Sequence, residues 1–158
     1  MVELKHIDEN GNAIMVDISS KNKTERTATA KGCIEVHADT IALIEGGGVK
    51  KGDVLSVAQL AGIMGAKRTS ELIPLCHQLN LSSVKVNLSC DPDRSVVDIE
   101  AICKICGQTG VEMEALTAVC ITALTIYDMC KAVDKGMNIN NIRLTHKAGG
   151  NSGVFEAE

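Results

Sequence analysis

The chain has 158 residues and a formal net charge of −4, and Tyr127 and Phe155 are its only aromatic side chains. This length predicts a single domain, residues 1–158, whose core must consist of Val, Ile, Leu, Met and Ala. Because the chain lacks both a basic field and aromatic side chains for base stacking, we expect no nucleic-acid partner.

The N-terminal residues carry no signal-peptide pattern, and no run of about 18 uncharged apolar residues occurs, so we expect a cytoplasmic protein without a membrane partner. The odd number of cysteines, 7, favours reduced thiols. Cys103 and Cys106 form a close pair, but no second pair or suitably spaced histidine completes a zinc site. We therefore predict no metal and no cofactor. Residues 1–14 and 154–158 are expected to be flexible ends.

Periodicity in the first half predicts a strand followed by short helices. From Arg26 to Val36, small and apolar residues alternate with Thr, Lys and Glu, which is a strand pattern. A helix from Asp39 to Glu45 runs into three glycines that would end it. Asp53 is suited to cap a second helix, and a turn or two from Thr69 to Ile73 stops at Pro74.

The second half predicts a hairpin, a long helix and a last strand. Val84–Ser89 and Val97–Ala101 alternate in polarity and are joined by the turn Asp91-Pro92-Asp93. The long helix covers Val111–Val133, and a strand follows near Ile139–Thr145. This order predicts an α+β fold with helices packed on one face of a sheet.

The long helix is uncharged and apolar or small on every face from Ala115 to Ile126. Such a helix is buried on all sides, which in a chain of this size suggests that a second subunit covers part of it. Its charged ends, Glu114 and Asp128, are about 21 Å apart along the axis. One small-molecule pocket in a single chain would not use both ends, so this helix suggests an oligomer with sites between subunits.

Asp128 and Lys131 share one face of this helix. Lys131 alone would simply complement the helix dipole, whereas an anion in the last turn is disfavoured and needs another reason. A lysine that transfers protons near neutrality also needs a lowered pKa; partial burial favours this, while the dipole and Asp128 oppose it. Glu112 and Glu114 have a structural explanation as acids in a first turn, and His77 in an apolar segment is more often a core residue.

Three groups of cations are candidates for an anion site, although their ordinary interpretation is a solvated surface. Lys51 lies beside a glycine run, and Lys147 precedes Gly149 and Gly150. Glycines let backbone N–H groups approach an anion to which a neighbouring lysine adds charge. Lys67 and Arg68 form the third group.

Several long segments carry a resemblance to a known family. They are Lys51-Gly-Asp-Val54, Ala66-Lys-Arg-Thr69, Leu72-Ile-Pro-Leu-Cys-His77, Thr109-Gly-Val-Glu-Met-Glu-Ala-Leu-Thr117 and Leu124-Thr-Ile-Tyr-Asp-Met-Cys-Lys-Ala-Val133. With Met15-Val-Asp17 and Lys147-x-Gly-Gly-x-Ser-Gly153, they resemble the MoaC family, the cyclic pyranopterin monophosphate synthases of molybdenum-cofactor biosynthesis. The resemblance runs from about Met15 to Phe155, nearly the whole chain.

The resemblance implies a lyase that converts the small molecule 3′,8-cyclo-7,8-dihydro-GTP into cyclic pyranopterin monophosphate and releases diphosphate. It assigns proton transfer or charge stabilisation to Asp128, Lys131 and Lys51. It places substrate contacts in two segments and in neighbouring charged residues: Leu75, Cys76, His77, Met113, Glu114, Glu112, Lys67, Arg68 and Lys147. It also implies a ferredoxin-like antiparallel sheet and a homohexamer, a trimer of dimers with sites at the dimer interface.

Two positions depart from the pattern common in the family. Gln78 stands where many members have proline, and Asn151 stands where a basic residue is frequent; both predict altered affinity at most. Two other functions stay open. One is a non-catalytic oligomeric protein that binds purine nucleotides or pterins, and the other is a zinc or redox module on Cys103 and Cys106.

Overall fold

The computed structural model describes residues 6–151 and 153–157. Its elements are β1 (Thr24–Glu35), α1 (Ala38–Glu45), α2 (Val54–Lys67), α3 (Thr69–Leu72), β2 (Ser83–Asp91), β3 (Val96–Gly107), α4 (Glu112–Cys130), β4 (Asn138–Ala148) and β5 (Phe155–Glu156). The strands form one five-stranded sheet in the order β2-β3-β1-β4-β5, and every neighbouring pair is antiparallel.

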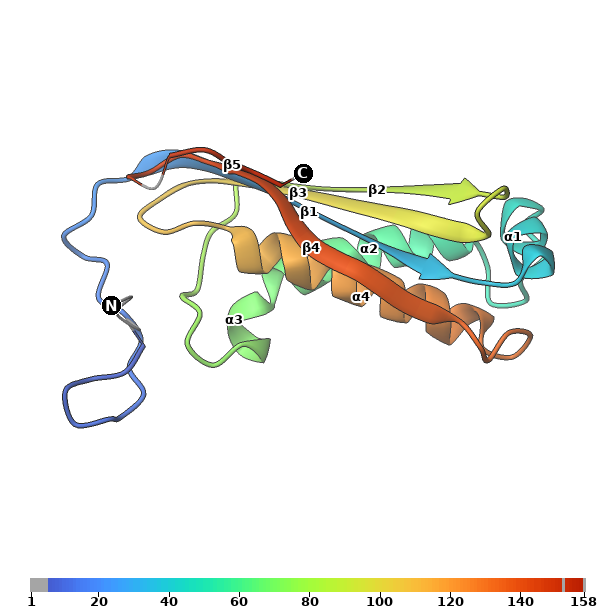
Figure 1. Ribbon diagram of the computed structural model, residues 1–158, viewed down its shortest axis with the longest axis horizontal. Helices are drawn as coiled ribbons and strands as arrows, with labels where there is room; N and C mark the ends of the chain where they lie inside the picture. Colours follow the sequence, from blue (N-terminus) through green and yellow to red (C-terminus); the bar gives the residue numbers. More distant parts are fainter. Residues whose placement is uncertain (1–5, 152, 158) are drawn as a thin grey trace.

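Two crossover units generate this sheet. β1 and β2 are joined through α2 and flank β3, while β3 and β4 are joined through α4 and flank β1. The helices α2 and α4 lie side by side beneath one face of the sheet (Figure 1). The predicted α+β fold, a ferredoxin-like antiparallel sheet with helices packed on one face, is confirmed.

The alternation along the central strands sends small and branched side chains toward the helices. Ala28, Ala30 and Ile34 of β1 are fully buried, and so are Val97 and Ala101 of β3. Successive side chains of a strand point to opposite faces, so the intervening polar residues lie on the other side of the sheet. The core is therefore the layer between the sheet and the pair α2 and α4.

Two glycines of α2 allow this helix to pack closely on α4. A β-carbon at Gly62 would lie 2.1 Å from Oγ1 of Thr122, and one at Gly65 would lie 2.7 Å from Cγ1 of Ile121. Because neither glycine has a side chain, the two helix backbones can approach one another. Close helix contact is thus how a core without aromatic side chains is filled.

α4 is the one helix in the described residues that is long and apolar enough to cross a membrane by length and composition, yet 56% of that segment is buried inside the fold. Burial against the sheet and α2 explains its composition. Leu124 is nonetheless 54% exposed, so the single chain leaves one side of α4 uncovered. The prediction that a second subunit covers that side stays a prediction. Val57, Leu60 and Met64 of α2 are also exposed. These four exposed apolar side chains belong to the two helices that pack beneath the sheet.

The predicted start of the second helix is confirmed. The carboxylate of Asp53 accepts a hydrogen bond of 3.0 Å from the backbone N–H of Ser56, as an N-cap residue does. The predicted end of the first helix is confirmed as well, since α1 ends at Gly46 and the next residue, Gly47, has a φ of +66°.

Two strand predictions fell short at their ends. β3 continues past Ala101 to Gly107 because its second half pairs with residues 24–29 of β1. The segment expected to be a flexible end contains β5, in which Phe155 pairs with Lys147 of β4. The added part of β3 depends on a partner far away in the chain, and β5 depends on the chain folding back onto β4. Local periodicity reports neither pairing.

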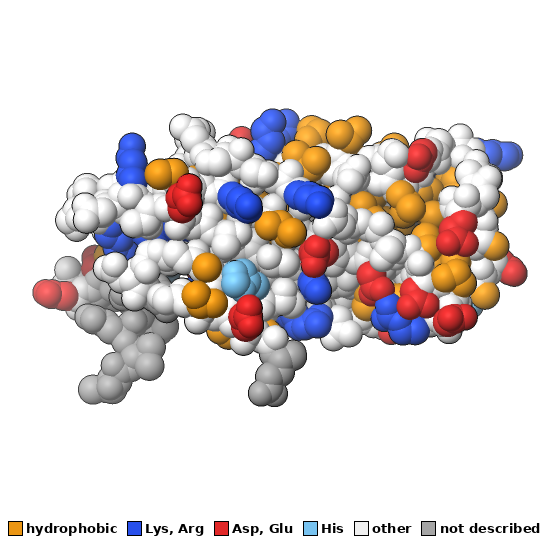
Figure 2. Space-filling view, turned by 90° about the horizontal axis from the view of Figure 1, so that it is seen from above, with side chains coloured by type: hydrophobic (Ala, Val, Ile, Leu, Met, Phe, Trp, Pro, Cys, Tyr) orange, Lys and Arg blue, Asp and Glu red, His pale blue; other side chains and the backbone are white. Residues whose placement is uncertain are grey.

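The face of the sheet opposite the helices is polar. Figure 2 shows this face, on which acidic and basic side chains are interspersed. It is formed by the outward residues of the alternating strands, such as Lys31 and Glu100, whose charged groups are 3.4 Å apart. A solvated face of this kind is common in antiparallel sheets.

Candidate active site

A first cluster of predicted site residues lies at the C-terminal end of α4. The carboxylate of Asp128 lies 2.7 Å from Nζ of Lys131, which directly follows the helix, and 3.2 Å from Nζ of Lys51. Lys51 comes from the loop between α1 and α2, far away in the sequence. The structure therefore brings together the three residues to which the resemblance assigns catalysis.

The two lysines set the charge of this cluster. Hydrogen bonding and charge from Lys131, and then from Lys51, hold the pKa of Asp128 below its ordinary value. In return, the hydrogen bond and charge of Asp128 raise the pKa of Lys131. The interaction with Asp128 thus outweighs any effect of burial on Lys131, whose side chain is 54% exposed. At neutral pH the free chain presents an ionised carboxylate between two ammonium groups.

A second cluster lies near the N-terminal end of α4. A hollow of about 260 Å³ collects the predicted substrate contacts of both segments, which are Leu75, Cys76, His77, Glu112, Met113 and Glu114. The loop after α3 supplies the first three and the first turn of α4 supplies the others. The ring of His77 is fixed by a contact of 2.7 Å between Nε2 and the carbonyl oxygen of Val16. We call this the ring-side hollow.

Glu114 is the buried acid of this hollow, with a relative exposure of 4%. Burial raises its pKa to about 7, and the nearby charge of Glu112 adds to the rise. A carboxyl group with this pKa can hold or release a proton near neutrality. The helix dipole explains why an acid is found in the first turn of α4. It does not explain why the carboxyl group of Glu114 is buried.

A smaller hollow of about 180 Å³ adjoins the first and shares Lys21, Thr109, Gly110 and Glu112 with it. Its cationic residues are Lys21, Arg26 and Lys147. Nζ of Lys147 lies 2.9 Å from Oε1 of Glu112. We call this the cationic hollow. It contains the predicted residue Lys147.

Sequence reasoning missed Lys21 and Arg26. Lys21 lies in the irregular segment before β1, and Arg26 lies inside that strand, where an isolated cation indicates an ordinary surface residue. The one sequence signal was the neighbouring segment Met15-Val-Asp17, which belonged to the resemblance but carried no assigned role. Only the pairing of β1 with β3 places Arg26 beside the start of the long helix.

Four other positions singled out in the sequence are exposed and do not belong to either cluster. Lys67 and Arg68 end α2 with exposed side chains and line neither of the two hollows. Gln78 and Asn151, the two departures from the family pattern, are exposed as well. Ser152 of the glycine-rich motif lies outside the described residues.

Cys103 and Cys106 do not form a joint site. Cys103 is fully buried on the helix side of β3, whereas Cys106 is exposed. Residues three apart in a strand point to opposite faces, so these thiols cannot bind one ion while β3 keeps its pairing. Burial also raises the pKa of Cys103 to about 12, which keeps this thiol protonated. The geometry gives no support to a zinc or redox module.

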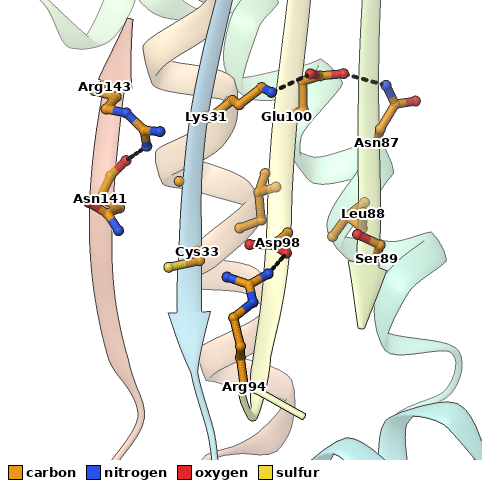
Figure 3. A pocket seen from close by; sticks show the side chains of 12 residues that line it. Lys31, Cys33, Asn87, Leu88, Ser89, Arg94, Asp98, Glu100, Asn141 and Arg143 are labelled. Carbon is orange, nitrogen blue, oxygen red and sulfur yellow. Dashed lines mark hydrogen bonds and ion pairs between the residues drawn. The ribbon is translucent and has the colours of Figure 1, made fainter. Parts of the chain in front are cut away.

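The uncovered sheet face has a further hollow, of about 450 Å³, without any of the predicted site residues. Figure 3 shows that its charged groups bond to one another: Lys31 points to Glu100, and Arg94 bonds to Asp98. Arg143 donates to a backbone carbonyl oxygen at 3.0 Å. Since none of the predicted site residues lines this hollow, we place the candidate active site at the ends of α4 instead.

The two clusters are separated by the length of α4. Glu114 and Asp128 are fourteen positions apart on one continuous helix, about 21 Å along its axis. In the single chain, the cluster around Asp128 and the ring-side hollow therefore lie at opposite ends of a helix.

The comparisons with known proteins show the family to which this chain belongs. The profile of the MoaC family matches residues 15–150. The cyclic pyranopterin monophosphate synthase of Rhodospirillum rubrum is 61% identical over 98% of this chain and 93% of its own length. The synthases of the same name from Dinoroseobacter shibae and Peptoclostridium acidaminophilum are 59% and 54% identical, over 100% and 99% of both chains. This chain belongs to the MoaC family.

Proposed function

We propose that this protein is a cyclic pyranopterin monophosphate synthase, a lyase that converts 3′,8-cyclo-7,8-dihydro-GTP into cyclic pyranopterin monophosphate and diphosphate for molybdenum-cofactor biosynthesis. The sequence identity of 61% and 59% to two proteins of that name, over nearly the whole length of the chain, supports the proposal. The observation that carries it is the cluster in which Asp128 lies between Lys51 and Lys131. The GTP-derived substrate and the free cysteines support a cytoplasmic location.

The cluster has the groups that this reaction needs. The purine-derived rings must open and reclose as a pterin, so protons must be removed and returned. A sugar hydroxyl must also attack the innermost phosphorus, forming a P–O bond as the bond to diphosphate breaks and the hydroxyl proton leaves. Asp128 is present in its basic form and Lys131 in its acidic form, while Lys51 offsets negative charge.

We further infer that complete sites form between two copies of the chain. The cluster of Lys51, Asp128 and Lys131 and the ring-side hollow lie about 21 Å apart, too far to act on one small substrate within a single chain. A two-fold pairing could place the C-terminal end of one α4 near the N-terminal end of another. The exposed apolar side chains of α2 and α4, which are Val57, Leu60, Met64 and Leu124, support such pairing. The hexamer implied by the family resemblance would contain three such dimers.

Subunit complementation tests the shared site. Asp128→Ala and Glu114→Ala chains are co-expressed with different tags, and mixed dimers would contain one site with both native residues. With random pairing we expect about a quarter of the wild-type activity to return. The matched control combines Asp128→Ala with Lys131→Ala, which damage the same cluster and leave no intact site in any dimer. Equal activity of the two mixtures would contradict a site between copies.

The function itself is tested by turnover of 3′,8-cyclo-7,8-dihydro-GTP, with diphosphate release and pterin fluorescence as separate readouts. We expect both signals from the wild type and the loss of both in Asp128→Ala. Substrate binding without either product would overturn the synthase proposal. It would leave the alternative function, a non-catalytic nucleotide- or pterin-binding oligomer.

A further inference from the structure

Gln108 lies between β3 and α4 and lines the cationic hollow. We propose that Gln108 is a positioning residue for phosphate binding, which fastens residues 19–21 so that Lys21 lies in the same hollow as Arg26 and Lys147. The inference rests on the proposed function for the nature of the ligand, a phosphate chain. It adds a residue to which the sequence analysis gave no role.

The side chain of Gln108 bridges two backbone carbonyls of the segment before β1. Its amide Nε2 donates to the carbonyl oxygen of Lys21 at 2.9 Å and to that of Ser19 at 3.2 Å. A neutral amide group has two N–H donors and can therefore hold two carbonyls at once. These bonds cross 87 and 89 residues of sequence. They tie an otherwise irregular segment to the end of the sheet.

The backbone at Gln108 positions a second cation. Nη2 of Arg26 donates to the carbonyl oxygen of Gln108 at 3.3 Å, and Nε donates to that of Gly107 at 3.0 Å. On the other side, a β-carbon at Gly150 would lie 2.1 Å from Nη1 of Arg26, so the chain after β4 closes tightly on this guanidinium. Gln108 thus holds Lys21 by its side chain and Arg26 by its backbone.

The charges of the hollow point to an anionic ligand. Among the described residues, Lys21, Arg26 and Lys147 supply three positive charges to it, and Glu112 is the one acidic residue that lines it. Lys147 and Glu112 form an ion pair with each other. The hollow thus retains about two uncompensated positive charges, which suits a di- or triphosphate group. Because Lys21 lines both hollows, a ligand with its rings in the ring-side hollow would meet Lys21 where its phosphates begin.

The test compares Gln108→Leu with the wild-type full-length protein, using inorganic diphosphate as the probe in titration calorimetry. Leucine keeps approximately the size of the side chain but removes both N–H donors. We expect the affinity for diphosphate to fall about tenfold, because Lys21 loses its fixed place. Hydrogen exchange of residues 18–23 should also become faster without ligand. The matched control is Gln59→Leu, which removes a comparable amide bond of 2.7 Å to the carbonyl of Val86 on β2. It should change neither readout.

A double-mutant cycle separates positioning from general stabilisation. If Gln108 acts through Lys21, then Gln108→Leu should cause no further loss of diphosphate affinity in a Lys21→Met background. Additive losses, or unchanged affinity in Gln108→Leu, would overturn the inference. Because the probe is diphosphate, these results do not depend on turnover. A protein that binds diphosphate through Gln108 but forms no pterin would refute the proposed function alone.

Discussion

Lys51 contacts the last turn of α4 through both the backbone and the side chain of Asp128. Its ammonium group donates to the carbonyl oxygen of Asp128 at 2.8 Å and lies 3.2 Å from the carboxylate. The carbonyls of a last helical turn have no partners within the helix and carry the negative end of its dipole. Lys51 donates a hydrogen bond to one of these carbonyl oxygens and also pairs with the carboxylate of Asp128, which the helix dipole disfavours at this position. This contact explains how Asp128 is accommodated at this end of a helix.

Replacing Asp128 by asparagine should remove turnover without unfolding the protein. The substitution keeps the shape of the side chain but removes the base and the charge between the two lysines. We expect kcat to fall by a factor of about 100 or more. The thermal unfolding temperature should hardly change, because this cluster is exposed and such ion pairs add little stability. Asp93→Asn, at an exposed turn, is the control. Full activity in Asp128→Asn would exclude a proton-transfer role.

Glu114 should make the protein less stable as the pH rises toward neutrality. Its pKa is about 7 in the folded chain, against an ordinary value of 4.5. Between these values the folded chain keeps a proton that the unfolded chain has released, so this stabilisation is full below pH 4.5 and is lost as the pH rises through about 7. Glu114→Gln should therefore raise the free energy of unfolding at pH 8 by roughly 1–3 kcal/mol.

Urea unfolding of wild type and Glu114→Gln across this pH range gives the measurement. Glu112→Gln, in the same helical turn but paired with Lys147, serves as the comparison. A wild type and a Glu114→Gln variant with parallel pH profiles would show that Glu114 titrates normally.

Gly62→Ala should destabilise the fold through the contact between α2 and α4. The new methyl group would lie 2.1 Å from Oγ1 of Thr122 and 3.1 Å from the carbonyl oxygen of Ala118. Overpacking of this kind costs about 1–3 kcal/mol, measurable by urea unfolding. Thr122→Ala in the same chain removes the hydroxyl and should restore much of the loss. A double variant no more stable than Gly62→Ala would show that the clash with Thr122 is not the cause.

Thiol reagents should distinguish the two cysteines of β3. Iodoacetamide at pH 8 should modify the exposed Cys106 in the native protein and leave Cys103 unmodified, because Cys103 is fully buried and its pKa is raised to about 12. Mass spectrometry of peptides gives the readout, and unfolding in urea should expose Cys103. Protection of both thiols together with stoichiometric zinc would instead support the metal module.

Much of the fold could be predicted because its signals are local. The alternation from Arg26 to Val36 predicted β1, and Asp53 predicted the start of α2 from its capping side chain alone. The predictions ended early at β3 and missed β5, because both segments gain their structure from paired strands. The exposed side of α4 could not be interpreted from the sequence either. An apolar composition predicts that a helix is buried, but it does not say which element or subunit covers each side.

The sequence by itself determined the order of strands and helices from β1 to β4, the apolar character of α4 and the residue types that could transfer protons. These follow from periodicity and side-chain chemistry within short segments. Only the tertiary structure decided which polar and charged groups come into contact, because each contact joins segments that are distant in the sequence. A loop brings Lys51 to Asp128 across 77 positions, and the pairing of β1 with β3 brings Arg26 to Gln108. Distance in space sets the strength of an electrostatic interaction, and local sequence patterns do not contain that distance.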